Sequence, residues 1–111
     1  MAKIDEKIEL YKNEVKKLGL DIEEALIEAI SKSLVPAIYR ADAETVSCSD
    51  SSELDRVREN FLKKKLNIDR EDLDELIKEV CQEMGSSNRK KYRAIFYALL
   101  AKKVGKESNY I

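Results

Sequence analysis

Histidine and tryptophan are both absent from this sequence of 111 residues. Histidine is the commonest metal ligand and the commonest general acid or base near neutral pH, so its absence argues against zinc sites and catalytic triads. We therefore expect no metal, no cofactor and no catalytic residue. No apolar run approaches the roughly 18 residues that a membrane span requires. The sequence thus predicts no membrane partner.

Net charge is also nearly absent, because 21 Lys and Arg almost cancel 22 Asp and Glu to leave -1. Bulk charge therefore predicts neither a nucleic-acid nor a membrane partner, and only a local patch could provide one. The chain becomes charged at Lys3 and shows no apolar core of a signal peptide. We expect a cytoplasmic protein.

Cysteine occurs twice, as Cys48 and Cys81, without the spacing of a pairing motif. In a reducing compartment we expect two free thiols rather than a disulfide. Cys48 lies two residues before an expected helix cap at Asp50, where the helix dipole would favour a thiolate. Asp50 opposes that effect and no histidine can act as base, so we expect a packed, non-catalytic Cys48. Cys81 lies on an apolar helical stripe, where burial explains it.

Glycine and proline are scarce, with three Gly and one Pro, while 43% of the residues are hydrophobic. This composition is typical of a compact helical domain and argues against disorder. A chain of this length forms one domain with a core of its own. The sequence therefore predicts a single all-α domain over residues 1–111, with about five helices and no strand.

Apolar residues recur every three or four positions in five segments, which predicts five amphipathic or buried helices. Gly, Pro and Asn separate the segments. The expected helices cover residues 5–18, 21–34, 51–66, 69–84 and 87–103, with a short helical piece at 36–41. Asp residues in cap positions are expected to begin three of them, at Asp21, Asp50 and Asp69, each with an acidic residue three positions later. Ile38 and Tyr39 are expected to plug one end of the core.

The last of these helices, at about 87–103, is the expected core helix. Its residues 94–101 are apolar on every side, and a helix of that kind is normally buried. We expect Phe96 and Leu99 to be almost fully buried. Gly105 is expected to end this helix in a left-handed turn.

Four cations occupy the expected start of the core helix: Arg89, Lys90, Lys91 and Arg93. The positive end of the helix dipole makes a cation unfavourable there by a few tenths to about 1 kcal/mol. Either acidic residues of another helix neutralise these cations, or the corner binds an anion through backbone N–H groups, hydroxyls and guanidinium groups. The residues of this anion-site hypothesis are Ser86, Ser87, Arg89, Lys90 and Arg93. Retention on heparin that weakens with salt would support it, and passage without retention would count against it.

A second basic cluster consists of Lys63, Lys64 and Lys65 at the end of the third expected helix. Successive residues of an α-helix lie about 100° apart, so the three side chains cannot form one flat contact. We interpret this cluster as a solvated face whose position suits the negative end of the helix dipole.

Four stretches of the chain carry a family resemblance: CSDSSELDRV (48–57), NFLKKKL (60–66), MGSSNR (84–89) and KYRA (91–94). They resemble the DUF2853 family of small bacterial proteins, which is known only as a domain of unknown function. The resemblance covers nearly the whole chain and implies a compact helical protein of this length. It implies no activity, cofactor or catalytic residue.

Three classes of function remain open from the sequence. The first is a non-enzymatic interaction or structural module, with a protein partner or with self-association through the apolar stripe of the first helix. The second is a phosphate-binding or nucleic-acid-binding module that uses the basic helix start at 86–93. The third, and the least favoured, is an enzyme built on Cys48.

Overall fold

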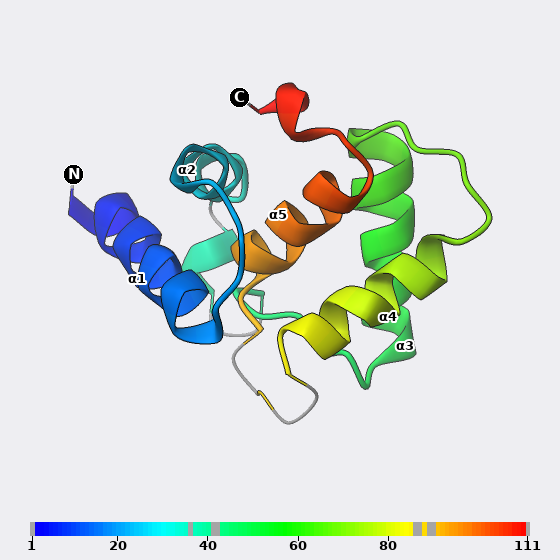
Figure 1. Cartoon of the computed structure of the whole chain (residues 1–111), viewed down its shortest axis with the longest axis horizontal. Helices are drawn as coiled ribbons and strands as arrows, with labels where there is room; N and C mark the ends of the chain where they lie inside the picture. Colours follow the sequence, from blue (N-terminus) through cyan, green and yellow to red (C-terminus); the bar gives the residue numbers. More distant parts are fainter. Residues whose placement is uncertain (1, 36, 41–42, 86–87, 89–90, 111) are drawn as a thin grey trace.

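Helix α5 (Arg93–Lys103) lies at the centre of the molecule, with α1 and α2 on one side and α3, η2 and α4 on the other (Figure 1). All residues from Ala94 to Ala101 are buried, as the apolar run predicts. Phe96 is fully buried and Leu99 is 5% exposed, so both burial predictions are confirmed. Helix α5 packs against α1, α2, α4 and the C-terminal η3.

The computed structural model describes residues 2–35, 37–40, 43–85, 88 and 91–110, and all statements below refer to these. Its elements confirm the predicted all-α class. In chain order they are α1 (Ala2–Leu18), α2 (Glu24–Ser33), the 3-10 helix η1 (Ala37–Tyr39), α3 (Ser51–Arg56), the π-helix η2 (Val57–Lys65), α4 (Leu73–Glu83), α5 and the 3-10 helix η3 (Glu107–Asn109). None of the described helices combines the length and apolarity needed to cross a membrane.

The apolar stripe of α1 faces inward. Ile8, Tyr11 and Val15 are buried, and α1 packs against α2. The hydroxyl of Tyr11 donates to Glu44 Oε2 at 2.7 Å, and Lys7 Nζ lies 2.8 Å from the same oxygen, which ties α1 to the loop before α3. The stripe is therefore part of the core, and the expectation that it serves as a surface for self-association is wrong.

The core helix begins later than predicted, at Arg93 instead of residue 87. Asn88, Lys91 and Tyr92 are described and lie outside it. Lys91 and Tyr92 pair with the loop at 44–46. Tyr92 forms an isolated antiparallel bridge with Thr45. Val46 N donates to Lys91 O at 2.8 Å, and Arg93 N donates to Glu44 O at 2.6 Å. This pairing holds Tyr92 at φ -59° and ψ 132°, outside the helical region, so α5 begins at Arg93.

Of the three expected Asp caps, only Asp50 is confirmed. Its Oδ1 accepts from Ser52 N at 3.0 Å and from Glu53 N at 3.4 Å. Helix α2 begins at Glu24 without a side-chain cap, and Asp21 instead forms an ion pair with Lys102 at 3.1 Å. Helix α4 begins only at Leu73, so Asp69 does not cap it, and Asp72 accepts from Arg70 at 2.7 Å. A long-range ion pair replaces the local cap at Asp21, and the later start of α4 leaves Asp69 outside that helix.

Two further expectations change in detail. Ile38 is fully buried as expected, but Tyr39 is 42% exposed and does not plug the core. The third helix covers the expected range, but from Val57 it continues as a π-helix, in which Leu66 N donates to Phe61 O at 2.9 Å. Asn67, with φ of 55°, ends it as predicted.

Replacing Leu99 by Ala should lower the free energy of unfolding by about 2 to 5 kcal/mol, because a buried side chain would leave a cavity at the centre of the fold. Leu10→Ala is the matched control: Leu10 is 39% exposed, so a change within about 0.5 kcal/mol is expected. Denaturant melts of both variants measure the difference. Equal losses for the two would mean that α5 is not the core helix.

Candidate functional site

The predicted anion site is described only in part. Ser86, Ser87, Arg89 and Lys90 lie outside the described residues, whereas Arg93 is described at the first position of α5. The anion-binding role of the four undescribed residues stays a prediction. For Arg93, however, the partners can be named.

Arg93 points into the protein and uses all three guanidinium nitrogens. Its Nε donates to Ala43 O at 2.7 Å, and one terminal nitrogen donates to Tyr97 Oη at 2.9 Å. The other terminal nitrogen donates to Thr45 O at 3.4 Å and forms an ion pair with Glu53. The Arg93 and Glu53 side chains are only 12% and 9% exposed. This is the internal neutralisation that the sequence left open as the alternative to an anion site.

The environment of Arg93 keeps it charged. Burial alone would lower the pKa of its guanidinium, but Tyr97 and Glu53 outweigh that effect, so the pKa of Arg93 is raised above its usual value. Burial also raises the pKa of Tyr97, which keeps the phenol neutral. Buried charges are stable only when paired and hydrogen-bonded, as they are here.

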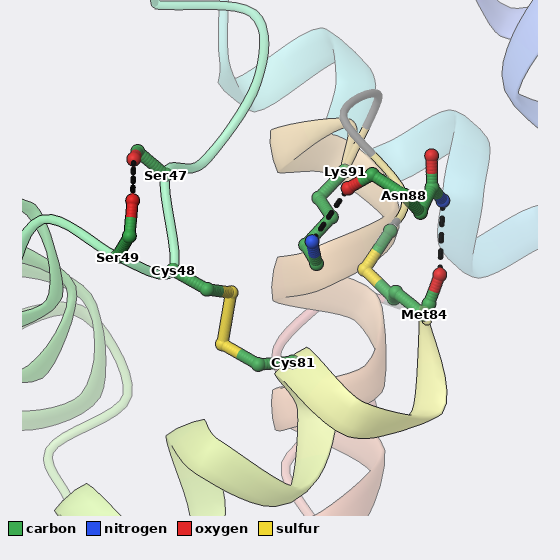
Figure 2. The surroundings of a disulfide bond; sticks show 7 residues. All are labelled: Ser47, Cys48, Ser49, Cys81, Met84, Asn88 and Lys91. Atoms are coloured by element: carbon green, nitrogen blue, oxygen red, sulfur yellow. Dashed lines mark hydrogen bonds between the residues drawn. A yellow bond between two sulfur atoms is a disulfide. The ribbon is translucent and has the colours of Figure 1, made fainter. Parts of the chain in front are cut away.

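Lys91 is also turned inward, with 6% of its surface exposed. Its Nζ lies 2.5 Å from Asn88 O, and Asn88 Nδ2 donates to Met84 O at 2.9 Å (Figure 2). The ammonium group therefore stabilises the connection between α4 and α5 by donating to the backbone carbonyl oxygen of Asn88.

The expectation of two free thiols is wrong, because Cys48 and Cys81 form a disulfide (Figure 2). The Cα atoms are 6.1 Å apart, within the range that a disulfide spans. The bond joins the loop before α3 to α4, two segments that packing brings together across 33 sequence positions. Because the two cysteines are 33 positions apart in sequence, no local pattern indicates that they lie close together. The expectation of a cytoplasmic location loses the support that free thiols would have provided.

A surface trough lies where the end of α2, the π-helix η2 and the C-terminal segment meet α5. It consists of two adjoining hollows of about 230 Å³ and 410 Å³, which share Leu34, Asn60 and Tyr97 as lining residues. The smaller hollow is also lined by Ser33, Phe61, Lys65 and Tyr110. Arg93 and its partner Glu53 line the larger one, together with Ala37, Ala43 and Arg56.

The floor of the trough is aromatic. The rings of Phe61 and Tyr97 stack with centroids 3.9 Å apart and planes inclined by 15°, and both residues are at least nine-tenths buried. Three residues of η2 line the trough, namely Asn60, Phe61 and Lys65. In a π-helix residue i bonds residue i+5, so Asn60 and Lys65 lie nearer one face than on an α-helix. π-Helical turns are often found at functional sites.

The rim of the trough carries polar groups without protein partners. Within the described part of the chain, neither Asn60 nor Lys65 makes a side-chain hydrogen bond or ion pair, and Lys65 is exposed. The sequence predicts only that Lys65 is part of a solvated face, and does not associate it with Leu34 or Tyr97. No periodicity in the sequence could have indicated this association, because the three residues come from separate elements.

Among the described residues, no cluster of three or more Cys, Asp or Glu side chains could hold a metal ion. What the arrangement offers is a concave surface with an aromatic floor and polar rim groups, which suits binding.

The fold and site define a small all-α protein with a cross-linked loop and an amphipathic trough. The chain belongs to the DUF2853 family, described as a protein of unknown function, whose family model matches residues 10–108. No protein with a curated description shows significant sequence similarity to the chain. Family membership, expected from the sequence motifs, is thus confirmed.

Removing the disulfide should destabilise the fold. Because the bond closes a loop across 33 positions, Cys48→Ser with Cys81→Ser should lower the free energy of unfolding by about 2 to 4 kcal/mol in urea melts. The parent protein in dithiothreitol should lose a similar amount, and the double variant should not respond to the reductant. A folded parent with two thiols that react with a thiol reagent, and no effect of dithiothreitol, would contradict this.

Proposed function

We propose that the protein is a non-enzymatic helical module that acts by binding, and that the trough between α2, η2 and α5 is its binding surface. The observation that carries the proposal is the stacked pair of Phe61 and Tyr97 beside Asn60 and Lys65, whose side chains have no partner among the described residues. Binding sites are concave, mostly apolar surfaces with a few well-placed polar groups. The trough combines these features.

The disulfide supports a binding role over the cysteine-based enzyme. A nucleophilic cysteine acts as a thiolate, and the sulfur of Cys48 is bonded to that of Cys81. Asp50, the nearest carboxylate in sequence, is engaged in capping α3, which lowers its pKa through hydrogen bonds from Ser52 and Glu53. Cys48 and Asp50 are therefore both engaged in structural contacts, a disulfide and a helix cap, which argues against a cysteine-based enzyme.

Amide chemical shifts in ¹⁵N-labelled protein test the proposal. Titration with a panel of single-ring and double-ring aromatic compounds, both charged and neutral, should shift the amides of residues that line the trough, with Leu34, Phe61 and Tyr97 at its centre. The filled variant Leu34→Trp should lose these shifts. Leu10→Trp, at an exposed position of α1, is the matched control and should keep them.

Two outcomes would count against the proposed function. One is a panel in which no compound shifts the trough amides at millimolar concentration. The other is a set of shifts that is the same in the Leu34→Trp and Leu10→Trp variants, because binding would then occur elsewhere.

A further inference from the structure

The geometry points to a ligand class for the trough: a small organic anion with a flat apolar body, bound as a carboxylate or a similar acidic group. This inference rests on the proposed function and adds the chemistry of the ligand to it. The apolar body lies against the aromatic floor, and the acidic group lies at the rim beside Lys65.

The smaller hollow sets the size of the apolar body. At about 230 Å³ it is smaller than most ligand pockets, which limits the apolar body to one or two rings. Leu34 and Tyr110 line it together with the stacked Phe61 and Tyr97. Aromatic rings prefer offset-stacked or edge-to-face contacts, so a flat ring gains more here than a branched aliphatic body of equal size.

The charges along the trough favour an anion. Among the described residues that line the two hollows, the cations are Lys65, Arg56 and Arg93, and the one acid is Glu53. Glu53 is already paired with Arg93 and lies 3.1 Å from Arg56. Its charge is therefore compensated, and the excess charge of the trough is positive. A concave site lined by one sign of charge concentrates ligands of the opposite sign.

Among the described cations that line the trough, Lys65 is the one without an ion-pair partner. Its neighbour Lys63 lies 3.1 Å from Glu59, whereas Lys65 has no ion-pair partner among the described residues. Lys64 is also exposed on the same helix but is not among the residues that line either hollow. Lys64 is therefore a matched control for Lys65.

The test compares 2-naphthoate with its neutral analogue 2-naphthamide, each titrated into the full-length protein and followed by amide chemical shifts. Naphthoate should bind in the trough about threefold to fivefold more tightly, which is the size of one solvent-exposed ion pair. Lys65→Gln should reduce naphthoate affinity to that of the amide, and Lys64→Gln should leave it unchanged. The preference for naphthoate should also shrink at 1 M salt.

Three outcomes would contradict the proposed ligand class. If both compounds bind in the trough with equal affinity and Lys65→Gln has no effect, the ligand class is wrong while the proposed function stands. If Lys64→Gln weakens naphthoate as much as Lys65→Gln does, the preference is a general charge effect and the class is again wrong. If neither these compounds nor the wider panel shift the trough amides, the ligand class and the proposed function both fail.

Discussion

The buried ion pair between Arg93 and Glu53 connects the core helix α5 to α3. Arg93 begins α5, and Glu53 lies in the first turn of α3, 40 positions earlier in the sequence. Both side chains are nearly buried, so each would cost several kcal/mol if left without its partner. The guanidinium also holds the carbonyls of Ala43 and Thr45. One side chain thus positions the loop, α3 and the start of the core helix.

The same interaction extends to the proposed binding surface. Arg93 donates to the hydroxyl of Tyr97, one turn further along α5, and Tyr97 stacks on Phe61 of η2. The floor of the trough is therefore aligned by a residue whose charge is satisfied inside the protein. Lys65 lines the smaller hollow and has no ion-pair partner among the described residues, which is the basis for proposing that it meets the ligand.

Local patterns in the sequence predict most of the fold. The apolar run at 94–101 identifies the core helix, and the spacing of Ile8, Tyr11 and Val15 identifies the inward face of α1. Asp50 is recognised as a cap because its hydrogen bonds reach only two and three residues ahead. Such features depend on neighbours in sequence, so one chain is enough to reveal them.

The candidate site depends on contacts that no local pattern contains. Glu53 has the spacing of a capping-box residue, but its carboxylate reaches Arg93 and Arg56 instead. Cys48 and Cys81 meet across 33 positions, and Leu34, Phe61 and Tyr97 meet from three elements. The π-helical turn also escapes notice, since over nine residues its apolar spacing resembles that of an α-helix. Tertiary packing determines each of these.

The free energy of unfolding of Glu53→Gln, compared with that of Asp55→Asn, tests most directly whether the Arg93–Glu53 pair organises the structure. Asp55 lies two residues further along α3, where its 60% exposed side chain pairs with Arg58 at 3.1 Å. Glu53→Gln should cost about 3 to 5 kcal/mol, because Arg93 would stay buried without its counter-charge. Asp55→Asn should cost less than about 1 kcal/mol. Equal and small losses for the two variants would contradict the account and leave the charge of Arg93 available to an external anion.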